Sequence, residues 1–444
     1  MKVMRTLAMV CVAALFAVTA AYGDQVCQNI SMDEAVKLAL AHNPGIKQAV
    51  QDVRAAESRI SQARAGFMPS ITASASYIFA HEVPKIGIPA NSIGPGFPPS
   101  NIESRLDSTY TYNAGFNATW TLFAGGMILN SYSATKDLFK AASYTEQDTR
   151  LDTVYRVKEA YYDLLLAQDS VGVIRHSMDL AKEQYRNAKS RFEAGSVSDL
   201  DVLNAKVSVS NLRPQLLAAQ NNIKLAELTL SNLMGVAFTD AICGNPAVAM
   251  PALPGSLDDL QAEAEHSNFQ LKALEGQISA SKASLAVSAG KFSPTLALMA
   301  NYNWLTNDFS GAWQPVYQAA LVLALPLFNG GGDVGRVSEA DANYRKLLSV
   351  RYQLRDTIGV VMETAYANAL VAQKELRSSE DALVTAQKAE SMAEEQYRAG
   401  TAINTDVLNA NVGLREAQLD YIKAKYSYLT ALAQLDRIEG KTAY

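Results

Sequence analysis

Residues 192–205 read FEAGSVSDLDVLNA, and residues 397–410 read YRAGTAINTDVLNA. The two stretches are identical at 7 of 14 positions. Both lie between long segments in which apolar residues recur with a helical period. A duplicated turn between two helices therefore decides the fold.

Each stretch combines a signal for the end of one helix with a signal for the start of the next. Gly195 and Gly400 can adopt the positive φ that closes a last helical turn. Ser198 or Asp199 in the first stretch, and Asn404 in the second, can accept hydrogen bonds from the first amides of the following helix. The pattern predicts two αα-hairpins with matching tips.

The repeat covers nearly the whole mature chain. Residues 32–77 align without a gap with residues 257–302 at an offset of 225, and residues 123–235 align with residues 328–440 at an offset of 205. The offsets differ by 20, so the first repeat holds 20 extra residues between positions 77 and 123. Most of them form a stretch rich in proline and glycine, which predicts a long exposed loop.

The predicted unit has the order helix, strand, strand, long helix, tip, return helix. We divide the chain into a signal peptide (1–23), a first repeat (24–235), a linker (236–256) and a second repeat (257–440). In the first repeat the elements are helix 33–66, strands 70–80 and 108–122, long helix 126–192, tip 193–199 and return helix 200–234. In the second they are helix 257–291, strands 295–305 and 315–328, long helix 333–398, tip 399–405 and return helix 406–438.

The N-terminus has the pattern of a secretory signal: Lys2 and Arg5 precede an apolar core from Leu7 to Ala21. No later run reaches the ~20 apolar residues of a membrane-spanning helix. The formal charge is −5, and becomes −7 once Lys2 and Arg5 are removed. A mildly acidic chain without a basic run gives no support for nucleic-acid binding. We expect an exported protein without a transmembrane helix.

The sequence gives no support for an enzyme, a cofactor or a metal site. Gly330, Gly332 and Gly335 match the dinucleotide motif G-x-G-x-x-G, but more than 100 residues of helical pattern follow where that fold needs a second strand. The 4 histidines have no ligand spacing, and no nucleophile motif is present. Cys27 and Cys243 can pair in an oxidising compartment, and the sequence leaves open whether they do.

The strands alternate between apolar and polar residues, most clearly over residues 108–122. The aromatic residues of the apolar face would suit either the core of a β-sandwich or a lipid-facing belt. We favour the belt, because the aromatic residues alternate strictly with Thr and Asn and because the chain carries a predicted signal peptide. Its predicted members are Tyr77, Tyr110, Tyr112, Trp120, Tyr302, Trp304 and Tyr317.

Four such strands cannot stand alone in a membrane, because lipid cannot satisfy the polar groups of two unpaired edges. Membrane barrels need about 8 strands or more, so several chains must share one barrel. Two chains would supply 8 strands and three would supply 12, and periodicity does not choose between them. The Thr- and Asn-rich face favours a water-filled interior.

The long helices predict a coiled coil. A helix over residues 126–192 spans about 100 Å, too long for an ordinary globular domain. In the second repeat, small and apolar residues are spaced alternately four and three apart: Ala365, Ala369, Ala372, Leu376, Ser379, Leu383 and Ala386. Glu390 interrupts this seam. Leu419 stands in the second repeat where the first has Pro214, so we predict a bend in the first repeat only.

These motifs resemble the TolC-like outer-membrane efflux proteins. The resemblance rests on FMPS at 67–70, LFAGG at 122–126, LFNGG at 327–331 and the DVLNA that ends both tips. It implies a homotrimer in the outer membrane of a Gram-negative bacterium, with a 12-stranded barrel and a helical tunnel through the periplasm. It also implies two partners at the tips: a periplasmic adaptor and an inner-membrane pump, either proton-driven or of the ATP-binding-cassette type.

The resemblance further implies which tip residues narrow the periplasmic entrance: Phe192, Asp201, Asn204, Tyr397, Asp406 and Asn409. Asn409 departs from relatives that carry a second aspartate, so an acidic double ring is not expected. The residues expected to contact the adaptor are Gly195, Ser196, Ser198, Gly400, Thr401 and Ala402.

Two classes of function follow. The first is a passive exit duct of an efflux or type I secretion system, gated at its helix tips. The second is a structural periplasmic coiled coil without a pore. A passive duct carries no cargo signature, so drug, metal and protein export look alike in this sequence.

Overall fold

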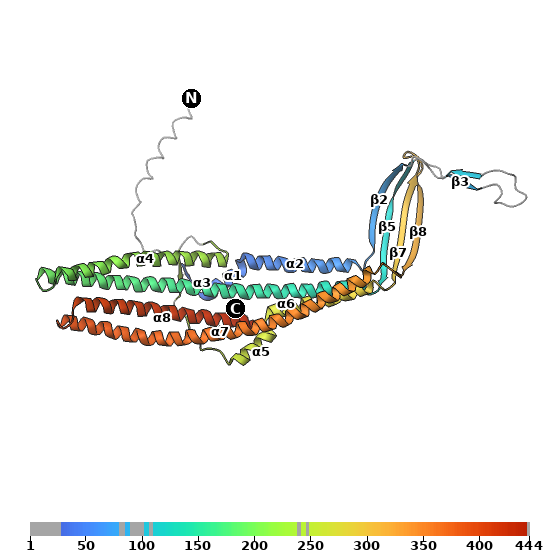
Figure 1. Cartoon of the computed structure of the whole chain (residues 1–444). Helices are drawn as coiled ribbons and strands as arrows, with labels where there is room; N and C mark the ends of the chain where they lie inside the picture. Colours follow the sequence, from blue (N-terminus) through green and yellow to red (C-terminus); the bar gives the residue numbers. More distant parts are fainter. Residues whose placement is uncertain are drawn as a thin grey trace, which may run out of the picture.

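The computed structural model describes residues 28–79, 85–88, 102–105, 110–237, 241–245 and 248–441. The predicted signal peptide and Cys27 lie outside these residues. Long helices run side by side through most of the molecule, and a sheet stands at one end of them (Figure 1). No helix among the described residues is long and apolar enough to cross a membrane.

One four-stranded antiparallel sheet contains strands from both repeats. Its strands are β2 (Ser70–Phe79), β5 (Tyr110–Ala124), β7 (Thr295–Thr306) and β8 (Gln314–Ala324), in the order β2-β5-β7-β8. β5 runs past the predicted end at 122, because a register shift between Thr121 and Phe123 lets pairing continue to Ala124. β8 stops before the predicted end at 328, since Pro326 has no amide to donate.

The stretch predicted as a loop also contains regular structure. β3 (Lys85–Ile88) and β4 (Ile102–Arg105) pair antiparallel within it. The sequence explains the difference: Pro84 and Pro89 flank a short run, KIGI, that has no proline of its own. Prolines at the ends of a strand bound it without removing its internal hydrogen bonds.

Four long helices form two hairpins. α3 (Met127–Glu193) and α7 (Gly332–Arg398) have 67 residues each, and α4 (Asp199–Met234) and α8 (Asn404–Glu439) have 36 each. α4 packs on α3, α3 on α8, and α8 on α7, so α4 and α7 are the outer members of the array (Figure 1). α4 continues through Pro214 as one helix, and the bend expected there stays a prediction.

The two shorter helical segments are each broken, which the sequence analysis did not predict. Instead of single helices over 33–66 and 257–291, the structure has α1 (Met32–His42), α2 (Pro44–Ala65), α5 (Leu257–Ser267) and α6 (Phe269–Gly290). Asn43 and Asn268 separate the two helices of each pair. Each asparagine is extended at ψ 127° and 121° respectively, and its Oδ1 accepts from the first amides of the next helix. The aligned asparagines were the available signal, strengthened in the first repeat by Pro44, which disfavours a helical residue before it.

The same asparagines join the short helices to the hairpins. Asn43 Nδ2 donates to Leu233 O at 2.7 Å, and Asn268 Nδ2 donates to Ile438 O at 3.4 Å. α2 therefore continues the line of α4 beside α3, and α6 continues the line of α8 (Figure 1). At the first joint the chain turns at Gly235, where φ is +66° and a Cβ would lie 2.5 Å from His42 O. The array is therefore four helices wide both toward the tips, where these are α4, α3, α8 and α7, and toward the sheet, where these are α2, α3, α6 and α7.

A small core holds the middle of the array. β1 (Gln28–Ile30) and β6 (Ile242–Gly244) form a parallel pair that packs with α1 against α3. Gln168 of α3 fixes β6 from both sides: Nε2 donates to Ile242 O at 2.8 Å, and Oε1 accepts from Gly244 N at 3.2 Å. Cys243 is disulfide-bonded. Its predicted partner, Cys27, lies outside the described residues, so that pairing stays a prediction.

Candidate channel wall and helix tips

One face of the sheet is apolar and aromatic. Directly paired residues of an antiparallel sheet share a face, and the register pairs Tyr77 with Tyr112, Phe116 with Tyr302, and Tyr302 with Tyr317. The predicted belt residues that the register places on this face are Tyr77, Tyr112, Trp120, Tyr302, Trp304 and Tyr317. The backbone of Tyr110 pairs with that of Phe79 in the same series.

Aromatic residues mark both ends of this face, and a further row between them consists of Phe116, Tyr302 and Tyr317. Tyr77 and Tyr112 lie at the end far from the helices, with ring centroids 4.9 Å apart. Trp120 lies at the helical end, where its Nε1 donates to Phe67 O at 2.9 Å. Tyr112 and Trp120 are eight residues apart on β5, which corresponds to about 27 Å along a strand. In a barrel whose strands tilt by about 40°, this length corresponds to about 20 Å along the membrane normal, of the order of the ~25 Å apolar band of such barrels.

The opposite face is mainly polar. One row across all four strands consists of Thr72, Asn117, Asn301 and Gln318. Asn117 Nδ2 also donates to Ser74 Oγ at 3.2 Å. The second repeat is less regular than expected, because β7 and β8 place apolar residues on this face as well: Met299, Leu305, Val316 and Val322.

The first helix tip is closed by a reciprocal cap. Gly195 has φ +74° and ends the turn after α3. Ser198 Oγ accepts from Asp201 N at 3.3 Å, and the Asp201 carboxylate accepts from Ser198 N at 3.1 Å and from Ser198 Oγ at 2.7 Å. Ser198, rather than Asp199, is therefore the cap of α4.

The second tip has only half of this cap. Ile403 aligns with Ser198 and holds the same extended conformation, but it has no side-chain acceptor. The Asp406 carboxylate still accepts from Ile403 N at 3.1 Å. The prediction that Asn404 caps α8 is wrong, because the cap position falls one residue earlier. Asn404 is buried instead, and its Nδ2 donates across to Asp201 O at the first tip, at 3.3 Å.

A second contact joins the two hairpins near their tips. The Arg191 guanidinium lies 4.3 Å from the ring centroid of Tyr397, a cation–π arrangement. Tyr397 is 8% exposed, whereas its counterpart Phe192 is 44% exposed. Arg191 could not be identified from the sequence, because nothing in its local pattern links α3 to a tyrosine in the other hairpin.

The remaining predicted tip residues are not brought together within one chain. Asp406 and Asn409 are exposed, and Asn204 is half-buried on the first turns of α4. The predicted adaptor-contacting residues are exposed, apart from Ala402, which is partly covered. Their roles at an entrance and toward an adaptor stay predictions.

The two long helices differ in how many residues they bury toward the tips. Between the middle core and the tip, α3 buries six residues: Val171, Ile174, Met178, Ala181, Gln184 and Ala188. α7 buries none between Ala372 and Tyr397, and every residue of that stretch is described. Leu376, Ser379, Leu383 and Ala386 of the predicted seam are only half-buried.

Glu390, which interrupts the seam, is a titratable group between the hairpins. Burial raises its pKa, and so does the neighbouring Glu394. His176 of α3 and Arg398 act in the opposite direction. Nearer the middle core the hairpins are joined firmly: Tyr426 Oη donates to Asp169 Oδ2 at 2.7 Å, and burial together with this bond raises the pKa of Tyr426.

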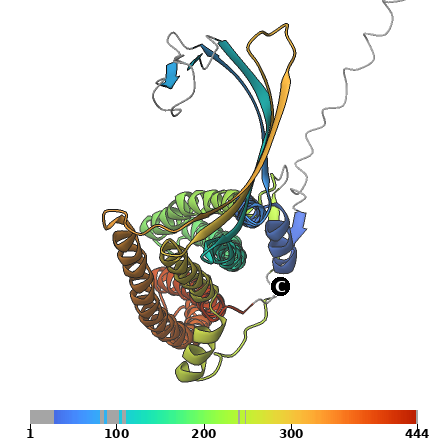
Figure 2. The ribbon, with the colours of Figure 1, turned by 90° about the vertical axis from the view of Figure 1, so that its right-hand side faces the viewer.

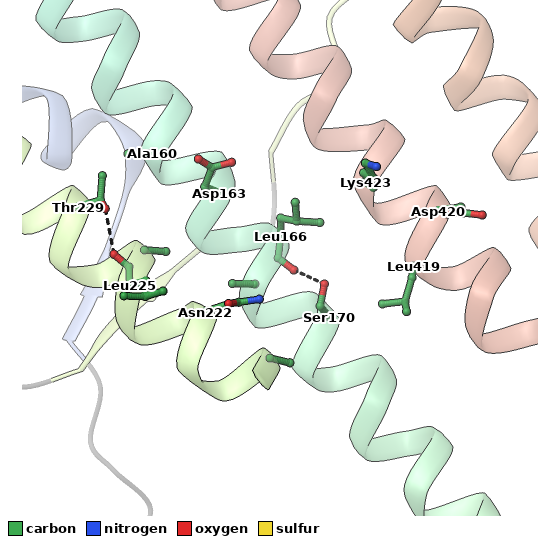
Figure 3. A pocket seen from close by; sticks show the side chains of 13 residues that line it. Ala160, Asp163, Leu166, Ser170, Asn222, Leu225, Thr229, Leu419, Asp420 and Lys423 are labelled. Atoms are coloured by element: carbon green, nitrogen blue, oxygen red, sulfur yellow. Dashed lines mark hydrogen bonds between the residues drawn. The ribbon is translucent and has the colours of Figure 1, made fainter. Parts of the chain in front are cut away.

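A cavity of about 530 Å³ lies over α3, between α4 and α8 (Figure 3). On α3 it is lined by residues that include Ala160, Asp163 and Ser170. The walls also carry polar and charged residues of α4 and α8: Asn222, Thr229, Asp420 and Lys423. Burial raises the pKa of Asp163. Within the described part of the chain, no three His, Cys, Asp or Glu side chains gather as a metal site.

Comparison with known proteins gives a consistent result. The profile of the outer membrane efflux protein family matches residues 35–236 and 260–441. The outer membrane protein TolC of Vibrio cholerae is 24% identical over 338 residues, 74% of this chain and 76% of that protein. The pyoverdine export outer membrane protein OpmQ of Pseudomonas aeruginosa is 22% identical over 419 residues, 92% of this chain and 85% of that protein.

The fold also matches solved structures. The CmeC outer membrane channel of Campylobacter jejuni superposes with a TM-score of 0.75 at 18% identity, over 92% of this chain and 85% of that one. The resemblance inferred from the sequence motifs is thereby confirmed. The chain belongs to the outer membrane efflux protein family, and is an outer-membrane transport protein that reaches into the periplasm of a Gram-negative bacterium rather than an enzyme.

Proposed function

We propose that three copies of this chain form a passive exit duct: a 12-stranded barrel in the outer membrane continued by a helical tunnel in the periplasm. The tunnel is gated at its helix tips by Phe192, Asp201, Asn204, Tyr397, Asp406 and Asn409. Substrates enter from an inner-membrane pump through a periplasmic adaptor, which contacts the tips.

The proposal rests on one observation: the sheet and the helical array each end in two outer members that lack a neighbour on one side. The sheet ends in β2 and β8, each paired on one edge only. The helical array ends in α4 and α7. Figure 2, which looks along the array, shows both parts as open curved layers. Further copies would pair β8 with β2 and pack α7 on α4, which removes every free edge.

The outer side of α4 supports packing against another copy. It exposes a series of apolar residues with helical spacing: Leu200, Leu203, Val207, Leu217 and Leu228. α7 exposes a comparable set: Val350, Val360, Val371, Val384 and Met392. Exposed apolar lines on both free edges favour helix packing between protomers over contact with water.

Native mass spectrometry of the detergent-extracted protein tests this arrangement, with three copies as the expected mass. Leu217 is 68% exposed in one chain, so Leu217→Glu should leave the protomer folded and lower the fraction of trimer. Gln220→Glu, an exposed position one turn away, is the matched control. A stable monomer that needs no detergent would instead support a structural coiled coil without a pore.

The partner proposal needs a separate test. A photo-crosslinker at Ser198 and another at Ala402, used in the native cell, should capture an adaptor together with its pump. A proton-driven pump would indicate drug or metal efflux, and an ATP-binding-cassette transporter would indicate type I secretion or ATP-driven export. Capture of neither protein at either tip would contradict the proposed partners.

A further inference from the structure

The turn between β7 and β8 is held by a compact set of hydrogen bonds. Thr306 Oγ1 donates to Asp308 O at 2.7 Å and accepts from Asp308 N at 3.2 Å. The Asp308 carboxylate accepts from Ser310 N at 3.1 Å and from Ser310 Oγ at 2.9 Å. Gly311 N donates to Asp308 O at 2.9 Å. These bonds fix the backbone on both sides of Phe309.

The fixed turn folds onto the aromatic face of the sheet. The ring of Phe309 lies 5.4 Å from that of Tyr112, and the ring of Trp313 lies 6.1 Å from that of Phe309. Tyr112 in turn contacts Tyr77. A continuous row of four aromatic rings therefore extends the far level of the belt beyond the strands. Phe309 is 68% exposed, and Trp313 is 36% exposed.

The burial of the Thr306 hydroxyl indicates that this end of the aromatic face is suited to an apolar medium. It pairs with Tyr112 in the register and so belongs to the aromatic face. Its side chain is nevertheless buried, and the turn supplies both of its hydrogen bonds. A bare hydroxyl at this level would be costly in an apolar medium and harmless in water. The turn removes the polar group from this surface and adds two aromatic side chains to it.

We propose that residues 306–313 form a lipid-interface anchor, in which Phe309 enters the edge of the acyl layer and Trp313 lies at headgroup level. The proposal rests on the barrel proposed above. Its occupant is the lipid of the membrane, because the exposed rings continue the belt that faces lipid in that barrel. Aromatic residues with one polar atom favour this boundary. Residues outside the strands thus help to set the depth of the barrel.

Tryptophan fluorescence can test the anchor directly. The chain has 3 tryptophans. Trp120→Phe with Trp304→Phe leaves Trp313 as the reporter, and Trp120→Phe with Trp313→Phe leaves Trp304 on the strand. Each protein is reconstituted as the assembled channel in phosphatidylcholine vesicles with bromines near the headgroup, with bromines deep in the acyl chains, or without bromine.

The expected result is loss of Trp313 emission with bromines near the headgroup and a smaller loss with deep bromines. Phe309→Ser, added to the Trp313 reporter, should reduce the first loss, because the ring that seats Trp313 is gone. If the reporter variant does not assemble, the difference between wild type and Trp313→Phe gives the same quantity.

The two proposals fail in different ways. If the Trp304 reporter is quenched by brominated lipid but Trp313 is quenched only by aqueous iodide, the barrel stands and the anchor is wrong. Trp313 in water would then leave the aromatic row available to an external macromolecule. If neither reporter responds to brominated lipid, the lipid-facing belt itself is wrong.

Discussion

The two hairpins have equal lengths and aligned tips, yet they are stabilised differently. The first hairpin is packed to its end: α3 buries residues down to Ala188, and α4 has a complete cap at Ser198. In the second hairpin α7 buries no residue between Ala372 and Tyr397, although α8 buries Val407 and Leu414, and the cap position of α8 is occupied by Ile403. We therefore expect α7 to be the more loosely packed of the two long helices over residues 373–396, and refer to its hairpin as the loose one and to the α3–α4 hairpin as the rigid one.

The difference has a consequence for movement near the entrance. Weakly packed segments open at lower free energy than segments with buried cores. Near the tips, two side-chain contacts hold the loose hairpin to the rigid one: Arg191 on Tyr397, and Asn404 on the carbonyl of Asp201. We expect the second hairpin to move against the first, with these two contacts resisting it.

The largest expected effect comes from truncating matched core positions. Met178 is buried in the first hairpin, and Leu383, its aligned counterpart, is half-buried. Met178→Ala should lower the free energy of local opening by about 2–5 kcal/mol. Leu383→Ala should lower it by only about 1 kcal/mol, because less apolar surface is removed from contact. Amide hydrogen exchange across each hairpin measures both, and equal effects would contradict the difference in packing.

The caps provide a second matched pair. Ser198→Ala should destabilise the start of α4 by about 1 kcal/mol. Ile403→Ser should stabilise the start of α8 by a similar amount, about 1 kcal/mol, since Asp406 is already placed to complete the cap. Exchange rates of the first-turn amides should rise in the first variant and fall in the second. A slower exchange of α4 after Ser198→Ala would reject the cap.

Removing the cation–π contact should favour the open tip. Arg191→Ala should cost about 0.5–1 kcal/mol of contact, which corresponds to a roughly 2- to 5-fold rise in the open-to-closed ratio. Single-channel recording gives that ratio. Arg191→Lys, which keeps the charge, is the control and should have a smaller effect. An unchanged ratio in Arg191→Ala would remove this contact from the gate.

The smallest expected effect is a pH dependence of the stability of the α7 segment around Glu390. Its pKa is raised in the folded hairpin, so its protonated form is the one that the fold favours. The contribution is complete below the unfolded value of about 4.3, and is lost as the pH rises through the raised value. Hydrogen exchange in residues 376–396, corrected for its intrinsic pH dependence, should report looser packing over that window. Glu390→Gln should abolish the change, and a change that persists in this variant must come from another group, such as His176.

The sequence was informative where a pattern repeats or alternates. Two copies of one pattern located the hairpins and the four long strands, because glycine, proline and periodicity act locally. The breaks at Asn43 and Asn268 were missed because an amphipathic period continues across a capping asparagine. The short β3–β4 pair does not follow from composition, because a stretch rich in proline and glycine favours a loop even where a short run without proline can pair.

The contacts between hairpins could not be predicted at all. Arg191 of α3 and Tyr397 of α7 are 206 positions apart, and their meeting depends on how the two hairpins pack. Likewise Asn404 looked like a cap because its local sequence permits one, but the backbone places the cap at Ile403. Which side chains meet across separate helices depends on how the helices pack. The periodicity of a single sequence does not predict that packing.

A planar-bilayer recording of the purified, detergent-extracted protein tests the proposed exit duct most directly. We expect discrete channels of low conductance in the wild type, and higher conductance when Tyr397→Ala is combined with Asp406→Ala at the tips. Discrete channels whose conductance is unchanged by these substitutions would remove the two residues from the gate. No channels in either protein would contradict the proposed exit duct.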